Sequence, residues 1–443
     1  MTYVYRVSIV AAASGFLFGF DIAVINGALL FLKQQFGLSE VQTEIAASAL
    51  LAGCVLGAAI GGWLSDRFGR KRILLFSAVL FALSSVGAAL PHNLDEFVAA
   101  RFTGGIAIGV ASLLAPLYIA EVSPAAIRGR LVGLNQMAIV TGIICSYVVN
   151  WGFSFEAVNG WRWMFAIATI PSLAFFIALF FVPESPRWLV EMGREGEALG
   201  ILKRVGDPAT APAQLESIRQ TIAEESGTLA ELFRPGMRLA LVIGLVLAVV
   251  QQWTGINTVL FYGSVILKEH VGHQSDTAAI GANVLVGGVN FVATIVALWL
   301  IDKVGRKALL MVSAGAMAVG LVCLGLVFRS TTPSPVMVIA AMLGCAAAFA
   351  VGLGPGVWVV LSEIYPTSIR GRAMSICTVA LWVACSVLTL TFLSITTAIG
   401  ITHTFWLYAG ICAFTVVFVW QVTPETKGKS LEEIEAFWRR KHV

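Results

Sequence analysis

Long apolar segments, separated by shorter polar ones, dominate the chain. A helix needs about twenty apolar residues to cross a hydrocarbon core of about 30 Å. An outer-membrane barrel would instead show alternating segments of about ten residues. We therefore expect an all-α membrane protein. The twelve predicted spans lie near 8–32, 44–64, 73–90, 97–120, 131–152, 161–182, 238–267, 277–301, 308–328, 335–361, 373–397 and 403–422.

The longest polar segment separates the spans into two groups of six. We expect six-helix bundles over 1–183 and 237–423, a linker over 184–236 and a tail over 424–443. Prolines and alternating charges in the linker predict short amphipathic helices. When loops are assigned to alternate sides, 24 of the 29 Lys and Arg residues fall on the side of the linker and both termini. This excess predicts a multi-pass inner-membrane protein with both termini in the cytoplasm.

The composition excludes several classes of protein. Apolar residues make up 58% of the chain and charged residues 12%, which is about half the charged share of a soluble globule. A soluble enzyme, a nucleic-acid-binding protein and a disordered scaffold are excluded on that ground. The seven cysteines lie in apolar segments without a C-x-x-C pair, and the five histidines lie at or beyond span ends. We therefore expect no metal, no cofactor and no catalytic residues.

Three motifs occur twice at nearly one spacing. WLSDRFGRK at 63–71 recurs as WLIDKVGRK 236 residues later. EVSPAAIRGR at 121–130 recurs as EIYPTSIRGR 242 residues later, and PES at 183–185 recurs as PET 241 residues later. This duplication predicts two parallel bundles related by an axis along the membrane normal.

Each motif falls at a predicted cytoplasmic helix end and combines carboxylates with arginines. A bidentate arginine–carboxylate pair is strong, yet an exposed pair is worth little once water reaches it. We expect a cytoplasmic latch that joins the two bundles while the outer side is open. The alternative, positive-inside anchors with helix-end charges, explains the basic residues but not the matched acids and glycines. The latch residues are Asp66, Arg70, Glu121, Arg128, Arg130, Glu184, Asp302, Arg306, Glu363, Arg370, Arg372 and Glu425.

Asp21 lies near the middle of the first span, with no other charged residue from position 8 to 31. A carboxylate at that depth is costly unless it is paired or protonated, so Asp21 is a candidate proton carrier. The alternative is a satisfied polar residue that caps a helix break after Gly19. Arg101, just inside the outer end of the fourth span, is the candidate partner. Helix tilt and side-chain length can close the difference in depth of about 10 Å.

The paired motifs resemble those of the major facilitator superfamily. PESPR at 183–187 and QQWTGIN at 251–257 resemble strings of its sugar porter family, and the resemblance extends from Gly19 to Thr426. It implies the major facilitator fold, with two parallel-repeat six-helix bundles and cytoplasmic helices. It also implies transport of a monosaccharide by alternating access.

A sugar site needs amides, which match hydroxyls as donors or acceptors, and an aromatic plate for the C–H face. By motif, the resemblance assigns the substrate contacts to Phe18, Gln136, Gln251, Gln252, Asn257, Asn290, Gly354, Trp358 and Trp382. Gln251 and Asn257 share a helix face only if the helix is irregular near Gly255. The GLGPG string at 352–356 is a candidate gate hinge, although glycine also permits plain close packing.

The string GFDIAVI at 19–25 resembles that of proton-coupled members, which have an acid at the Asp21 position and an arginine at the Arg101 position. Facilitative carriers have asparagine in place of the acid. A second acid found in some symporters is Ala168 here. A tyrosine and an amide of the xylose symporter are replaced by Phe261 and Leu381, which makes the pocket more apolar. We therefore expect an importer of a hexose such as glucose, driven by proton symport.

Two alternatives stay open. Within transport, the alternative is a facilitative uniporter. From another class, it is a membrane sugar sensor, which needs a long signalling tail, whereas the predicted tail has about twenty residues. The expected partners are a monosaccharide, protons and the lipid bilayer, without nucleic acid, and the chain is expected to be a monomer without enzyme activity.

Overall fold

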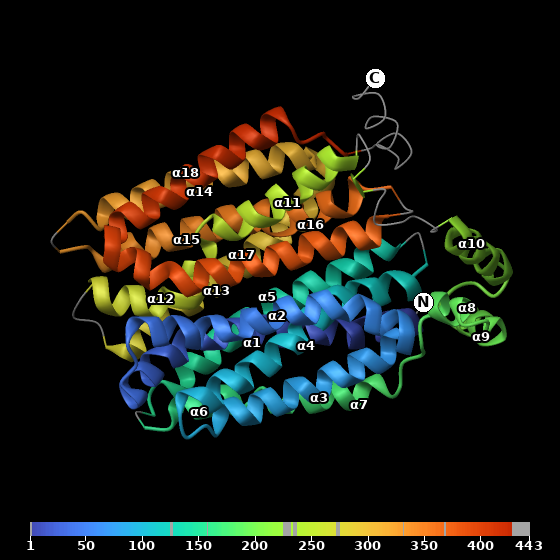
Figure 1. Ribbon diagram of the computed structural model, residues 1–443, viewed down its shortest axis with the longest axis horizontal. Helices are drawn as coiled ribbons and strands as arrows, with labels where there is room; N and C mark the ends of the chain where they lie inside the picture. The colour runs from blue at the N-terminus through green and yellow to red at the C-terminus, as the bar shows by residue number, and fades with distance from the viewer. Residues whose placement is uncertain are drawn as a thin grey trace.

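The computed structural model describes residues 2–124, 127–156, 158–224, 232–233, 237–271, 275–330, 332–366 and 369–427. Within these ranges the regular structure is entirely helical, and twelve segments are long and apolar enough to cross a membrane. The prediction of an all-α protein with twelve spans is confirmed. Figure 1 shows the long helices side by side, with three short ones at one end.

The first six spans contain seven helices, because the sixth span is divided near Ile167. They are α1 (Thr2–Phe36), α2 (Glu40–Phe68), α3 (Arg70–Ala89), α4 (Leu94–Val122), α5 (Arg128–Phe153), α6 (Gly160–Ala166) and α7 (Thr169–Leu179).

The last six spans contain eight helices, because two spans are divided near Gly255 and Gly352. They are α11 (Met237–Trp253), α12 (Ile256–Val271), α13 (Asp276–Val304), α14 (Arg306–Val327), α15 (Pro335–Val351), α16 (Leu353–Glu363), α17 (Arg370–Ile399) and α18 (Ile401–Gln421).

Three linker helices, α8 (Pro186–Glu191), α9 (Glu195–Val205) and α10 (Ala211–Glu224), lie beyond one end of the spans (Figure 1). We call this the linker end and the opposite one the far end. Arg219 of α10 donates to Glu195 of α9 at 2.8 Å, and its hydrogen bonds to Glu195 and Glu216 raise the pKa of Arg219. The indole of Trp188 donates to the carbonyl of Asp66 at 2.9 Å, which attaches the linker to the bundle.

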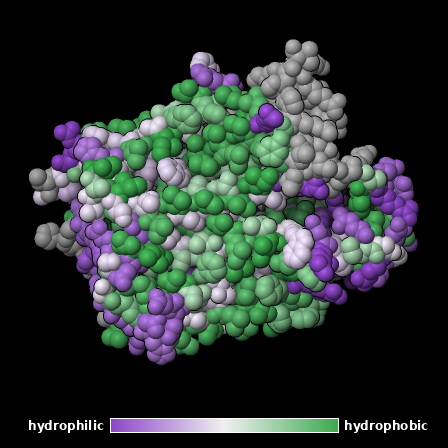
Figure 2. Space-filling model, viewed as in Figure 1, coloured by the Kyte–Doolittle hydropathy of each residue, from purple (hydrophilic) through white to green (hydrophobic). Residues whose placement is uncertain are grey.

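The surface fits the bilayer. Figure 2 shows a broad apolar band over the long helices and hydrophilic residues at both ends and on the linker helices. Large apolar side chains of the first and second half stay exposed, including Leu83, Phe181, Val319 and Phe414. In water these would be unfavourable, whereas lipid tails are as apolar as the side chains.

The sequence repeat is visible in the turns at the linker end. Gly69, between α2 and α3, and Gly305, between α13 and α14, have φ values of 96° and 102°. Residues other than glycine rarely adopt this backbone conformation. A Cβ atom added at Gly69 would lie 2.4 Å from the carboxylate of Glu184, and one added at Gly305 would lie 2.7 Å from that of Glu425. Glycine is therefore required in each motif for two reasons. The turn needs a positive φ, and the nearby carboxylate occupies the space that a side chain would fill.

Candidate functional site

Two helix breaks meet in the middle of the second half. α11 ends at Trp253 and α12 begins at Ile256, and Gly255 between them has a φ of 83°. The predicted irregularity at Gly255 is present. α15 ends at Val351 and α16 begins at Leu353, so the GLGPG string also interrupts its span.

A chain of amides joins the two breaks. Asn257 donates to the side-chain oxygen of Gln252 at 2.7 Å, and Gln252 donates to that of Gln251 at 3.1 Å. Gln251 in turn donates to the carbonyls of Leu353 and Gly354, at 2.8 and 3.0 Å. Each amide orients the next, so Gln252 and Asn257 are held in fixed positions for a ligand with hydroxyl groups.

Aromatic residues meet at the boundary between the halves. Phe18 of α1 lies edge-on to Trp382 of α17, with 5.6 Å between ring centroids. The indole N–H of Trp382 is buried and has no hydrogen-bond partner in the described part of the chain. Trp358 of α16 is half-buried. A buried donor without a partner is costly, so the N–H of Trp382 is available to a polar ligand.

Two other candidate amides come from helices that face each other across the halves. Gln136 lies on α5 and is half-buried, and Asn290 lies on α13 and is buried. Among the residues that the structure describes, their side chains form no hydrogen bond. They are therefore free to bind a ligand, in contrast to Gln251, whose amide group is already bonded to two carbonyls.

Asp21 and Arg101 form a buried ion pair in the first half. One guanidinium nitrogen of Arg101 donates to the carboxylate of Asp21 at 3.0 Å, and another donates to the Asp21 carbonyl at 2.7 Å. Only 4% of Asp21 and 1% of Arg101 is exposed, and the guanidinium lies 5.2 Å from the ring centre of Phe165. The structure thus brings the two predicted partners together, and each charge compensates the other away from water.

The acids and arginines at the linker end form the same network in each half. Arg70 holds Glu121 with two bonds of 3.1 Å, and Ser185 donates to the same carboxylate at 2.5 Å. In the second half, Arg306 holds Glu363 with bonds of 3.2 and 3.0 Å.

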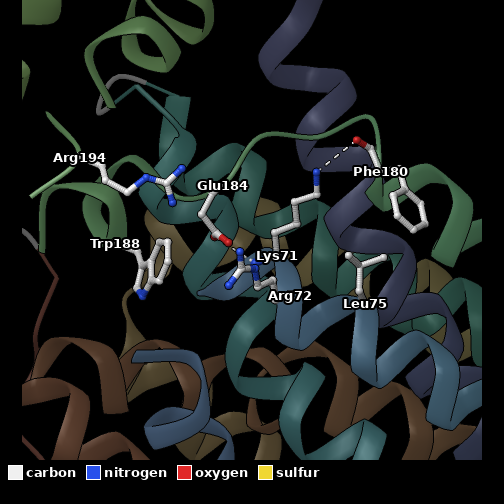
Figure 3. Close-up of a pocket in the computed structure, with 7 residues that line it drawn as sticks. All are labelled: Lys71, Arg72, Leu75, Phe180, Glu184, Trp188 and Arg194. Carbon is white, nitrogen blue, oxygen red and sulfur yellow. Dashed lines mark hydrogen bonds between the residues drawn. The ribbon is translucent and has the colours of Figure 1, made fainter. Parts of the chain in front are cut away.

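Glu184 and Glu425 cap helix starts. Glu184 accepts from the backbone N–H of Lys71 at 3.0 Å, as Glu425 does from that of Lys307 at 3.1 Å. Figure 3 shows Glu184 directed at the start of α3, beside a cavity of about 310 Å³ at the linker end. This cavity lies away from the amide chain.

These bonds all join residues of one half. In this structure Arg70, Glu121, Arg306 and Glu363 therefore hold helices within each half, and the predicted latch between the halves is not seen among them. A carboxylate oxygen of Asp66 lies 3.2 Å from a guanidinium nitrogen of Arg70. Arg128, Arg130 and Arg372 are exposed, and Arg370 is half-buried with its guanidinium 3.4 Å from the carbonyl of Tyr365. The side chain of Asp302 lies outside the described residues.

The two halves are bonded to each other at the far end. The amide of Asn26 on α1 donates to the carbonyl of Leu260 on α12 at 2.8 Å, and Tyr147 on α5 donates to the same carbonyl at 3.1 Å. Nearer the surface, Lys33 pairs with Glu269 at 2.5 Å. The far end is therefore closed in this structure.

Sequence reasoning missed the far-end residues. Asn26 and Tyr147 lie in predicted spans, but nothing in the local sequence shows which residues of the other half they face. The second predicted span starts at Glu44, whereas α2 begins at Glu40 and buries Glu44 one turn inside. A search for acids within apolar windows would have found it.

The described residues contain no group of three or more His, Cys, Asp or Glu side chains placed to hold a metal ion. Twelve spans in two repeated halves, buried amides in the membrane interior and a closed far end are together typical of a membrane carrier for a polar solute.

The chain belongs to the sugar (and other) transporter family, whose model matches residues 7–438. It is 40% identical to the arabinose-proton symporter of Bacillus subtilis (strain 168), over 99% of this chain and 96% of the relative. The resemblance to the sugar porters of the major facilitator superfamily is confirmed.

Two solved structures are similar over nearly their whole length. A structure of the major facilitator superfamily proton:xylose symporter bound to 6-bromo-6-deoxy-D-glucose has a TM-score of 0.85 and 36% identity, with 99% of each chain covered. The partially occluded inward-open conformation of the xylose transporter from E. coli has a TM-score of 0.87 and 35% identity, over 97% of this chain and 100% of that chain.

Proposed function

We propose that this protein imports a monosaccharide by alternating access, coupled to the entry of a proton. The observation that carries the proposal is the position of Asp21 on α1. Asp21 is paired with Arg101, and Phe18, three residues away on the same helix, contacts Trp382 of the other half. A change of charge at Asp21 can therefore alter the position of α1, the helix that borders the candidate sugar site.

The coupling follows from the ion pair. When Asp21 takes up a proton, its carboxylate loses the charge that compensates Arg101. The contact between α1 and its neighbours then changes, and the loaded carrier closes its outer side. One proton that enters down about 100 mV releases about 2.3 kcal/mol, which is enough to accumulate sugar about fifty-fold.

The sugar site extends over both halves in this proposal. Gln252, Asn257 and the Trp382 N–H meet sugar hydroxyls from the second half, with Gln136 from the first. Trp358 covers a C–H face. Bonding to groups from both halves gives the sugar a different affinity for the open and closed states, which is what allows a ligand to shift the equilibrium between them.

A hexose is the proposed substrate. Phe261 and Leu381 are both buried, so the region around the site offers less polar surface than a tyrosine and an amide would. The extra hydroxymethyl arm of a hexose adds both C–H surface and a hydroxyl group. The similar xylose symporter was solved with a glucose derivative bound, which supports the view that a site of this shape accommodates a hexose.

The proposal also covers orientation and state. The linker end faces the cytoplasm, by the excess of basic residues, so the closed far end faces outward and we assign the structure to a state that is closed on the outside. The units 1–183 and 237–423 move relative to each other, as a monomer in the inner membrane. In the outward-facing state, Arg128, Arg130, Arg370 and Arg372 approach the acids of the opposite half and form the latch.

Uptake by the purified protein in liposomes tests the proposal. Glucose, galactose, xylose and arabinose are offered with and without an imposed gradient that is acid outside. Accumulation of a hexose above the outside concentration, only with the gradient, is expected. Equal, non-concentrative uptake under both conditions would show a uniporter, and no uptake of any sugar would overturn the proposal.

A further inference from the structure

Glu44 is a second buried carboxylate, to which the proposed function assigns no role. It lies on α2 in the first half, and only 1% of its surface is exposed. Its two oxygens accept hydrogen bonds from the backbone N–H and the hydroxyl of Ser394 on α17 in the second half, each at 2.7 Å. The whole charge of Glu44 thus faces the other half of the carrier.

A second contact of the same kind lies one helical turn nearer the far-end surface. Glu40, four residues before Glu44, accepts from the hydroxyl of Thr397 at 2.7 Å. Glu40 and Thr397 are exposed, whereas Glu44 is buried. The two carboxylates therefore lie on one face of α2, and they differ in their access to water.

The repeat shows that the fold does not require an acid at this place. α2 and α13 have the same length, and each begins after a serine N-cap, 236 residues apart. The residue of α13 that corresponds to Glu44 is Ile280, which is also 1% exposed. α13 packs against α5 of the other half as α2 packs against α17, and the buried residue at this position of α13 is apolar. The buried carboxylate therefore occurs on α2 and not at the corresponding position of α13.

Closure of the far end has two large and opposite effects on the free energy of the buried carboxylate. Its removal from water is costly, and two charge-assisted hydrogen bonds offset most of that cost. When the halves separate at the far end, Ser394 moves away and water reaches the carboxylate. An apolar pair in the same place would lose free energy on opening without any gain from hydration.

We propose that Glu44 is the gating residue of the far end, and that its bonds to Ser394 set the ratio of far-end-open to far-end-closed carrier. This rests on the proposed alternating-access function, but it concerns only the conformational equilibrium without sugar. Loss of one bond leaves a buried charge poorly compensated and favours opening. Loss of the charge itself favours closure.

Four variants separate these effects. Ser394→Ala removes one hydrogen bond and keeps the charge. Glu44→Gln keeps the shape and removes the charge, and Glu44→Ile copies the other half. Thr397→Ala is the matched control, because it removes the same kind of hydroxyl bond from an exposed carboxylate.

The readout is the distance between spin labels at two far-end positions, measured by double electron–electron resonance on the full chain without sugar. The labels are attached to cysteines introduced by Leu90→Cys and Ser330→Cys. Leu90 and Ser330 are exposed at the far end of the first and second half, respectively. Cys323 is the exposed native cysteine and is replaced by serine in every sample. Monodispersity and melting temperature verify that each variant is folded.

Ser394→Ala is expected to raise the ratio of long to short distances about tenfold, in line with the cost of an unpaired buried group. Glu44→Gln and Glu44→Ile are expected to lower this ratio. In Thr397→Ala the ratio should stay within about twofold of that of the parent. An unchanged distribution in Ser394→Ala, or a shift of Glu44→Ile in the same direction as Ser394→Ala, would overturn the proposal. Because no sugar is present, neither result depends on the substrate assignment.

Discussion

The guanidinium of Arg101 holds two different atoms of Asp21, the carboxylate at 3.0 Å and the backbone carbonyl at 2.7 Å. Only the first of these bonds depends on the charge of Asp21. Protonation can therefore weaken the pair while the second bond keeps the two helices in register. This arrangement fits the role of proton carrier proposed for Asp21, because the helix can respond to a proton without loss of its packing.

The first prediction concerns this pair. Asp21→Asn is expected to abolish accumulation of sugar against a gradient, because the amide mimics the protonated acid permanently. Sugar binding and counterflow exchange should stay close to those of the parent, since the bond to the carbonyl remains. Concentrative uptake by this variant at the parental level would exclude Asp21 as the coupling group.

The second prediction concerns the amide chain. Gln252→Ala and Asn257→Ala should each weaken sugar binding by about 1–3 kcal/mol, the cost of an unpaired hydroxyl or amide in a dry site. Isothermal titration with glucose measures the change, and Gln220→Ala, at an exposed glutamine of the linker, is the control. If both site variants bind as tightly as the control, the sugar binds elsewhere.

The third prediction concerns the arginines at the linker end. Arg128→Ala or Arg370→Ala should shift the resting population toward the inward-facing state, because the latch proposed above forms only in the outward-facing state. Sugar affinity of the site itself should change little. Labelling of cysteines introduced at cytoplasm-facing positions should rise, and equal labelling of variant and parent argues against the latch.

The fourth prediction concerns the substrate. Glucose should outcompete xylose for uptake, because the buried Phe261 and Leu381 leave fewer polar partners for a pentose. Leu381→Gln restores an amide and should narrow the difference, since a site with buried amides discriminates between hydroxyl patterns. Tighter binding of xylose than glucose by the parent would reverse the substrate assignment and leave the transporter function intact.

Much of the fold could be predicted because membrane spans are determined by local sequence. Twenty apolar residues and a repeated motif are enough to place a span and its duplicate. The breaks near Gly255 and Gly352 were anticipated from glycine and proline. The break near Ile167 was not, although Pro171 marks it: Pro171 lies in the first turn of α7 and has no N–H to bond to the carbonyl of Ile167, four residues earlier.

The site was predicted where a residue conflicts with its surroundings. Asp21 in an apolar span requires a partner, and Arg101 was the cation within reach. The contacts between the halves could not be predicted in this way. Asn26 and Glu44 become meaningful only with their partners Leu260 and Ser394 in the other half, more than two hundred residues away. Such pairs depend on the conformational state, which no single segment determines.

The most direct test of the account follows protons and sugar together. Liposomes that contain the protein and an internal pH-sensitive dye are given glucose outside, with no imposed gradient. The account predicts that the interior acidifies as glucose enters, and that Asp21→Asn liposomes preloaded with glucose take up labelled glucose by exchange without acidification. Entry of glucose into parent liposomes without any acidification would contradict proton coupling.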